Sequence, residues 1–336
     1  MSLIISDPTL RDGNHALKHQ LSRNQIAEYA KRIDDAGVDM IEVGHGNGIG
    51  ASSIQVGIAK ESDDVMLKTA RDNIKNSKLS IHIIPGFATI DKGLQMAIDV
   101  GVDVFRVASH VTEADITEKH ISFARKNNKE VYGVLMMSHM ASINILIEEA
   151  LKMESYGAEG VIIMDSAGHY LPFDVEERIK GLSNALKGLV GFHGHNNMGM
   201  AVANSIVAAQ NGATIIDGCS RGFGAGAGNT QLEVLIPVLE KYGFKTGVDL
   251  YKVLDASDYA DNEIIPSIPA IKSTSIVSGL SGVFSGFLKH VERLAKEHSV
   301  DPRDVFFELG KRKVIAGQED IIVEVVLELA AKESKR

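Results

Sequence analysis

The sequence predicts an α/β protein, a (β/α)8 TIM barrel with a C-terminal helical appendage. Short apolar runs rich in Val and Ile alternate with amphipathic stretches of helical period, and a glycine turn recurs along the chain. Fully apolar strands are buried on both faces, as the strands of parallel sheets are. The expected strands are the runs LIIS, MIEVG, LSIHII, VFRVAS, VYGVLMM, GVIIMD, LVGFHG and TIIDG.

The first long helical stretch, LSRNQIAEYAKRIDDAGV, shows how each unit is delimited. Ser22 suits an N-cap, Gln25 completes a capping box with it, and Gly37 follows the expected last turn. Eight strand–helix units favour a closed barrel, although periodicity alone leaves a doubly wound open sheet as the alternative. A similar glycine precedes every second expected strand, at Gly37, Gly101, Gly157 and Gly212.

Beyond residue 262 the pattern changes to amphipathic helices without intervening strands. We therefore expect a catalytic barrel domain at residues 1–262 and a helical communication or partner-docking region at residues 263–336. The apolar stripes of the second region suit a partner protein, self-association into a homo-oligomer, and simple packing on the barrel equally well.

Composition narrows the classes of function. The formal net charge of -9, without a long basic run, argues against nucleic acid or an anionic membrane as the main partner. The single cysteine, Cys219, excludes an intramolecular disulfide and suits a reducing compartment. The sequence shows neither a basic and apolar leader nor an apolar run long enough to span a bilayer. We expect a cytoplasmic protein in which Cys219 is a packed residue rather than a nucleophile.

The motif FHGHNN predicts a metal site. It places His193 and His195 two residues apart on one expected strand, so both imidazoles point to the same face. Two histidines at the carboxyl end of a barrel strand suit a divalent cation, because neutral imidazole is a common ligand. A carboxylate at the end of the first strand can supply a third ligand, with Asp12 preferred and Asp7 the alternative.

The stretch DPTLRDGNH, which follows the first expected strand, adds candidate catalytic groups. Arg11 would stabilise a developing oxyanion, and His15 would act as a general base. A buried ion pair between Asp7 and Arg11 is the structural alternative. Structural hydrogen bonds or helix caps are the expected roles of four other histidines near strand ends, His45, His110, His139 and His169.

Two further features bear on the chemistry. No lysine is expected in the strands or directly after them, so a Schiff-base aldolase would lack its nucleophile. The glycine runs GHGNGIGASS and SRGFGAGAGN lack the Lys-Ser or Lys-Thr of a P-loop, and they read equally well as tight loops that let the chain approach the site. Asn229, at the end of the second run, is placed to reach the metal or its water.

Together, DPTLRDGNH and HGHNN resemble the signatures of the DRE-TIM metallolyases, in particular those of the 4-hydroxy-2-oxovalerate aldolases. The likeness spans nearly the whole chain, including the appendage. It extends to TLRDGNHA, GHGNGIGASS, MMSHM, DSAG, GAGAGN, FSGFLKH and GQEDIIVE.

The resemblance implies a metal-dependent cleavage of a 4-hydroxy-2-oxoacid to pyruvate and a short aldehyde, a reaction of aromatic hydrocarbon catabolism. It implies that Asp12, His193 and His195 bind a divalent cation, which is Mn2+, Mg2+ or Co2+. The substrate would chelate this ion through its C1 carboxylate and C2 ketone and would lie next to His193. Arg11 would hold the enolate and His15 would be the base. The resemblance also implies an acylating acetaldehyde dehydrogenase as the partner that docks on the C-terminal helices.

Two more positions follow from the resemblance. Ser166, in MDSAG, matches a serine near the pyruvate carboxylate. Phe284, in GVFSGFLKH, departs from the family pattern, in which a tyrosine approaches the catalytic histidine. The missing phenol brings the handedness at C4 and the assigned substrate into question.

Two other functions remain open at this stage. One is a Claisen-type condensing enzyme or lyase of the same superfamily that acts on an acyl-CoA, although no basic cluster near the expected strand ends would hold the CoA phosphates. The other is a catalytically silent barrel that binds a partner, against which the intact set of candidate site residues argues.

Overall fold

The structure is a computed structural model that describes residues 2–333. Eight parallel strands form one closed barrel in chain order, and β1 pairs with both β2 and β8. This closure confirms the predicted TIM barrel and excludes the open sheet. The strands are β1 Ile4–Asp7, β2 Met40–Glu42, β3 Lys78–Ile83, β4 Val104–His110, β5 Glu130–Met136, β6 Gly160–Asp165, β7 Leu189–Gly194 and β8 Ile215–Asp217.

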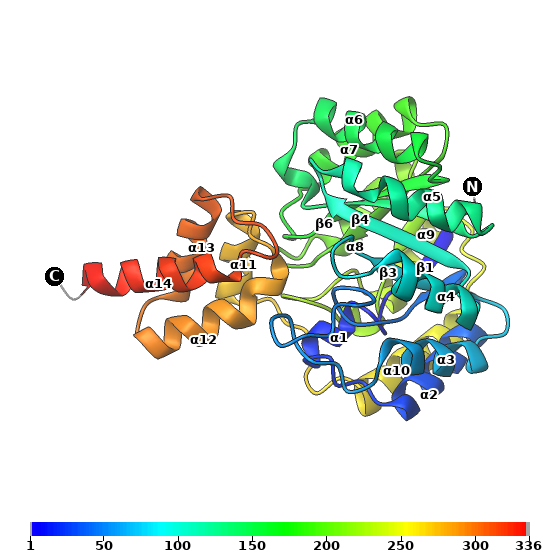
Figure 1. The fold of residues 1–336 in the computed structure, drawn as a ribbon, viewed down its shortest axis with the longest axis horizontal. Coiled ribbons are helices and arrows are strands. Elements are labelled where there is room, and N and C mark those ends of the chain that lie inside the picture. Colours follow the sequence, from blue (N-terminus) through cyan, green and yellow to red (C-terminus); the bar gives the residue numbers. More distant parts are fainter. Residues whose placement is uncertain (1, 334–336) are drawn as a thin grey trace.

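Helices surround the barrel on its outer side (Figure 1). The principal helices of the barrel are α1 Gly13–Ala16, α2 Arg23–Ala36, α3 Asp63–Asn73, α4 Gln95–Val100, α5 Glu118–Lys126, α6 Ile143–Ser155, α7 Pro172–Ala185, α8 Ala201–Gln210, α9 Leu232–Lys241 and α10 Leu250–Glu263. Short 3-10 or π turns are η1 Ile90–Leu94, η2 Ala114–Thr117, η3 Ser138–Met140 and η4 Ser220–Gly222. Of the described helices, none is long and apolar enough to cross a membrane.

The predicted residues at the ends of the helices are confirmed. Ser22 caps α2 through a capping box with Gln25, and Gly37 ends the helix with a φ of 88°. The other three recurring glycines also have positive φ values, which L side chains rarely adopt. Each therefore turns the chain from a helix into the next strand, at Gly101, Gly157 and Gly212.

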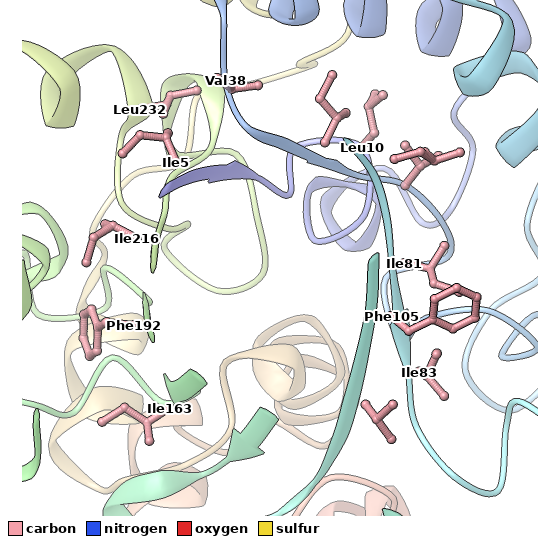
Figure 2. Close-up of a cluster of buried hydrophobic side chains, with 14 of the residues drawn as sticks. Ile5, Leu10, Val38, Ile81, Ile83, Phe105, Ile163, Phe192, Ile216 and Leu232 are labelled. Carbon is pink, nitrogen blue, oxygen red and sulfur yellow. The ribbon is translucent and has the colours of Figure 1, made fainter. Parts of the chain in front are cut away.

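Two apolar clusters stabilise the barrel. The larger lies between strands and helices and includes Ile5, Ile81 and Phe105, and Figure 2 shows its side chains distributed around the ring of strands. The smaller fills the barrel interior and includes Met40, Val104 and Ile162. Because side chains alternate along a strand, each strand supplies one face to each cluster.

One detail of the predicted strands is wrong. The third strand begins at Lys78, one residue before the expected run, so a lysine does occur in a strand. Lys78 pairs with Glu130, the first residue of β5, at the amino-terminal end of the barrel. That end lies opposite the loops that carry catalytic groups in this fold.

The C-terminal helices form a smaller bundle with its own apolar cluster, which includes Phe287, Val291 and Phe306. Figure 1 shows this bundle projecting from one side of the barrel. Its helices are α11 Ser273–Leu280, α12 Leu288–His298, α13 Pro302–Lys311 and α14 Glu319–Glu333, with the short turn η5 Ser285–Phe287.

The segment from α11 to the start of α12 rests on the loops at the carboxyl ends of the strands. The backbone N–H of Ser285 donates to the carbonyl of Ser166 at 2.9 Å. Lys289 Nζ donates to the carbonyl of Ala16, in α1, at 2.7 Å. The helical bundle is thus joined directly to the catalytic end of the barrel.

Candidate active site

The structure brings the three expected metal ligands together. One potential ligand atom from each of Asp12, His193 and His195 lies within 4.8 Å of the others, and all three residues are buried. His193 belongs to β7, His195 follows that strand directly, and Asp12 follows the loop after β1. The structure therefore brings the carboxylate after the first strand close to the two histidines of the HGHNN motif, as predicted.

The ring of His193 is fixed by a carboxylate behind it. His193 Nδ1 lies 2.8 Å from Asp217 Oδ2, and Arg106 Nη2 donates to the same oxygen at 2.6 Å. Burial alone would raise the pKa of Asp217, but Arg106 and His193 lower it to about 2, so Asp217 is ionised. Asp217 therefore holds the proton of His193 on Nδ1 and directs the lone pair of Nε2 into the site.

Asp12 is held as an anion. Its Oδ1 accepts from Arg11 Nη1 at 2.8 Å, and its Oδ2 accepts from Asn229 Nδ2 at 2.7 Å. Burial would raise the pKa of Asp12, but the positive charge of Arg11 and the nearby histidines keep it well below its usual range. Asn229 thus contacts an expected metal ligand, in the region where it was itself expected to reach the metal or its water.

The donor set suits a divalent cation. Within the described chain, His193 Nε2 and His195 Nδ1 are buried without hydrogen-bond partners. Burial lowers the pKa of His195 to about 4, so its imidazole is neutral at physiological pH. Two imidazoles and one carboxylate are typical ligands of a catalytic metal site that keeps positions open for substrate.

The guanidinium of Arg11 keeps one nitrogen without a hydrogen-bond partner among the described residues. Its Nε donates to Glu42 Oε1 at 2.5 Å and its Nη1 to Asp12, whereas Nη2 is buried and has no partner among residues 2–333. This arrangement contradicts the alternative ion pair with Asp7. Asp7 instead accepts hydrogen bonds from Thr9 and Tyr29, and burial raises its pKa to about 6.

Arg106 connects the two halves of the site, and the sequence analysis missed it. It is fully buried in the barrel interior, 3.1 Å from Glu42 through Nη1 and 2.6 Å from Asp217 through Nη2. A continuous chain of charges therefore runs from Arg11 through Glu42, Arg106 and Asp217 to His193. An arginine inside the otherwise apolar run VFRVAS was the available signal.

His15 lies on α1 against the loop that follows β2. A Cβ atom on Gly46 would lie 2.5 Å from the ring of His15, so only glycine permits this approach. Burial lowers the pKa of His15 to about 4, and the backbone of Gly46 beside its ring opposes this shift in part. A neutral imidazole has one nitrogen that can accept a proton.

Two more histidines pack next to His15. The rings of His19 and His45 stack with centroids 3.5 Å apart, and His19 meets His15 edge-on at 5.3 Å. His19 Nδ1 accepts from the N–H of Gly46 at 3.3 Å, and His45 Nδ1 accepts from Asn47 at 3.1 Å. These backbone bonds give His45 the structural role that was expected of it.

The other three histidines near strand ends are also structural, as expected. His139 Nε2 lies 2.9 Å from the carbonyl of Gly282, and His169 Nδ1 lies 2.7 Å from that of Gly279. His110 Nδ1 lies 2.9 Å from Thr112 Oγ1. Two of the three thus attach the helical bundle to the barrel.

Cys219, Ser166 and Phe284 complete the set of residues singled out from the sequence. Burial raises the pKa of the Cys219 thiol well above its usual value, which agrees with a packed residue. Ser166 Oγ is buried and accepts from the N–H of Met137 at 2.9 Å. Phe284 packs edge-on against Phe287 at 5.5 Å, and the following residue bonds to Ser166, so the chain at Phe284 lies beside the end of β6.

Two family models together match most of the chain. Residues 2–259 match the HMGL-like family model, and residues 269–331 match the DmpG-like communication domain. A 4-hydroxy-2-oxovalerate aldolase of Spirochaeta aurantia is 60% identical over 98% of this chain and 97% of that protein. One of Pectobacterium atrosepticum is 59% identical over 98% of this chain and 96% of that protein.

The chain belongs to the 4-hydroxy-2-oxovalerate aldolase family. It is therefore a carbon–carbon lyase with the HMGL-like barrel. A solved structure with the same fold is the carboxyl transferase domain of Rhizobium etli pyruvate carboxylase, with a TM-score of 0.83 over 98% of this chain and 60% of that chain. Its sequence identity is 15%, so this likeness shows the fold alone.

The charge chain through Arg106 yields a stability prediction. Arg106→Met removes the cation between Glu42 and Asp217 and leaves two buried carboxylates without their partner. The free energy of unfolding should fall by about 3–5 kcal/mol. Arg293→Met, which breaks an exposed pair with Glu297, is the control and should change it by less than about 1 kcal/mol. Urea denaturation measures both, and equally small losses would contradict the role of Arg106.

The neutral histidines yield a pH prediction. The pKa values of His15 and His195 are about 4 in the folded protein, below the ordinary 6.5. As pH falls from 6.5 towards 4, these two histidines bind protons in the unfolded chain but stay unprotonated in the folded chain. The free energy of unfolding should therefore fall, by up to about 1.4 kcal/mol per pH unit for each such histidine.

Urea denaturation of the chelator-treated protein at pH 7, 6 and 5 measures this dependence. His15→Asn should make it shallower, whereas His298→Asn, at an exposed position in the last turn of α12, should leave it unchanged. If the free energy of unfolding depended on pH equally in wild type and His15→Asn, the pKa of His15 would not be lowered in the folded protein.

Proposed function

We propose that this protein cleaves 4-hydroxy-2-oxovalerate, or a close 4-hydroxy-2-oxoacid, to pyruvate and a short aldehyde such as acetaldehyde. The observation that carries the proposal is the convergence of the Asp12, His193 and His195 triad with Arg11 and His15. The names of the relatives, at up to 60% identity, support the same reaction. They favour it over the acyl-CoA reaction and over a silent barrel.

Asp12, His193 and His195 would hold a divalent cation, Mn2+, Mg2+ or Co2+, beside the C1 carboxylate and C2 ketone. When bound, such an ion supplies Lewis-acid polarisation of the ketone. Asp217 keeps His193 in the tautomer that presents Nε2, and Asn229 orients Asp12. The protein therefore fixes the ligand geometry before substrate arrives.

His15 takes the proton of the C4 hydroxyl with its acceptor nitrogen. The electrons of that O–H bond form the C4 carbonyl of the aldehyde, and the electrons of the C3–C4 bond form the enolate of pyruvate. Arg11 Nη2, the buried N–H group without a partner, donates to the C2 oxygen as its negative charge develops. Protonation of the enolate at C3, balanced by the proton that His15 has taken and gives up again, completes the formation of pyruvate.

The roles of two residues near the end of β6 follow from the same proposal. Ser166 lies at the carboxyl end of that strand, where it would face the pyruvate carboxylate. Phe284 follows α11 in the segment that bonds to Ser166. In this proposal it lines the substrate site without offering a hydroxyl.

A metal-dependent assay tests the proposal. Wild type should release pyruvate, detected with lactate dehydrogenase, from 4-hydroxy-2-oxovalerate in the presence of Mn2+ and lose this activity after chelation. His15→Ala should reduce turnover by about 10²–10⁴-fold because a general base is removed. His298→Ala, at the exposed end of α12, is the control. Full activity after exhaustive chelation, or in His15→Ala, would overturn the assignment.

We also propose that the barrel domain ends near residue 262 and that residues 263–336 dock on an acylating acetaldehyde dehydrogenase. The match of residues 269–331 to a DmpG-like communication domain supports this partner. Phe307, Val323 and Leu327 are apolar and between 41% and 49% exposed on α13 and α14. A dehydrogenase surface that covers them would remove this apolar area from water.

Analytical ultracentrifugation of the protein mixed with such a dehydrogenase tests the docking. Leu327→Glu should weaken the complex by at least about tenfold, because a charge would be buried at the contact. Leu254→Glu, on exposed α10 of the barrel, is the control. Equal affinities of both variants for the dehydrogenase would place the contact elsewhere. The mass of the sedimenting species in the absence of dehydrogenase would show whether the chain is a homo-oligomer.

A buried, free Cys219 agrees with the cytoplasm, which we propose as the location of the enzyme.

A further inference from the structure

A further polar side chain, His82, faces the interior of the barrel near the carboxyl end of β3. Its neighbours Ile81 and Ile83 belong to the apolar cluster outside the barrel, so the alternation of the strand directs His82 inwards. In the register of the sheet, His82 lies opposite Arg106 of β4. The residue is 2% exposed.

One nitrogen of the His82 imidazole is not used by the fold. In the described part of the chain, its Nδ1 is buried without a hydrogen-bond partner. The other unpartnered buried atoms around it include Arg11 Nη2 and His193 Nε2, both assigned above to the reaction. Buried polar atoms in native proteins are generally paired, so an unpaired one facing a substrate site indicates a bond made with the ligand.

Its surroundings keep His82 uncharged. Burial, and then the positive charges of Arg11 and Arg106, hold its pKa well below the usual value. His193 opposes its protonation, and Asp12 favours it to a smaller extent. A neutral imidazole has one N–H donor and one acceptor nitrogen, so His82 can donate a hydrogen bond to a hydroxyl oxygen.

The loop that follows β2 places His82 and His15 on the same part of the barrel mouth. Gly46 of this loop packs on the ring of His15, and a Cβ atom on Gly48 would lie 3.4 Å from Cδ2 of His82. The N–H of Ile49, the next residue, donates to the carbonyl of His82 at 3.1 Å. Both rings therefore border the same loop, two residues apart along it.

We propose that His82 binds the C4 hydroxyl of the substrate, donating a hydrogen bond to its oxygen while His15 takes its proton. This assignment rests on the proposed aldolase function. The C1 and C2 oxygens are already assigned to the triad and to Arg11, so the C4 oxygen is the one that remains. When the C3–C4 bond breaks, the same N–H of His82 stays on the oxygen that becomes the aldehyde carbonyl.

Such a pair of contacts selects one hand at C4. The C3–C4 bond is oriented by the anchored oxoacid, so only one configuration presents its hydroxyl to His82 and His15 together. The opposite configuration presents hydrogen or the C5 methyl group, which cannot accept the bond. Phe284 offers no hydroxyl in this site, so His82 is the specificity-determining residue for the C4 oxygen.

Substitutions that separate hydrogen bonding from volume test the proposal. His82→Leu removes the bond, whereas His82→Asn retains a polar group near the position of Nδ1. With the two enantiomers of 4-hydroxy-2-oxovalerate, His82→Leu should lower kcat/KM for the preferred hand by about 10–100-fold and bring the two hands closer together. His82→Asn should recover part of both the rate and the preference.

Exchange of the C3 protons of pyruvate in deuterated water supplies a second readout. Pyruvate has no C4 hydroxyl, so its exchange should be unchanged in His82→Leu if His82 acts only on that group. Ser80→Ala, at the preceding inward position of β3, is the control and should change neither readout.

Two results would overturn the assignment of His82. Unchanged selectivity in His82→Leu would show that His82 does not contact the C4 oxygen. Equal losses of cleavage of both hands and of pyruvate exchange would show that it acts by positioning Arg11 or His193. Failure of wild type to cleave either enantiomer would instead overturn the aldolase function, and the His82 assignment with it.

Discussion

The need to balance charge inside a closed barrel governs this structure. Two arginines, Arg11 and Arg106, are buried with three carboxylates, Asp12, Glu42 and Asp217. Because an unpaired buried charge is costly, each member depends on its neighbours. These five side chains carry one excess negative charge. In the proposed function, a divalent cation together with the substrate carboxylate would bring the total to neutrality.

Backbone loops reach this charged centre only where glycine permits. A Cβ atom on Gly224 would lie 2.5 Å from Oδ2 of Asp12, and one on Gly46 would meet the ring of His15 at the same distance. Both glycine runs of the sequence are thus close-approach loops, one of the two interpretations that the sequence allowed. The N–H of Ala225 donates to Asp12 at 3.2 Å, so the second run also holds a ligand in place.

The parts of the site that could be predicted from sequence are those with a short local pattern. His193 and His195 share a strand face because the strand period is two, and Asp12 lies in the short loop that follows the first strand. Glu42, Arg106, Asp217 and His82 could not be placed from sequence in the same way. Each lies within or at the end of a largely apolar strand, and its neighbours come from other strands, so its role depends on the closure of the barrel.

The helical bundle is tied to the chemistry through the same end of the barrel. Lys289 bonds to α1, which carries His15, and Ser285 bonds to Ser166 at the end of β6. His139 and His169 add two bonds to the carbonyls that end α11. A displacement of the segment between α11 and α12 would therefore act on both the helix of the proposed general base and the loop of the expected carboxylate site. The hydrogen bonds that join the bundle to α1 and to the end of β6 pass through no intermediate element.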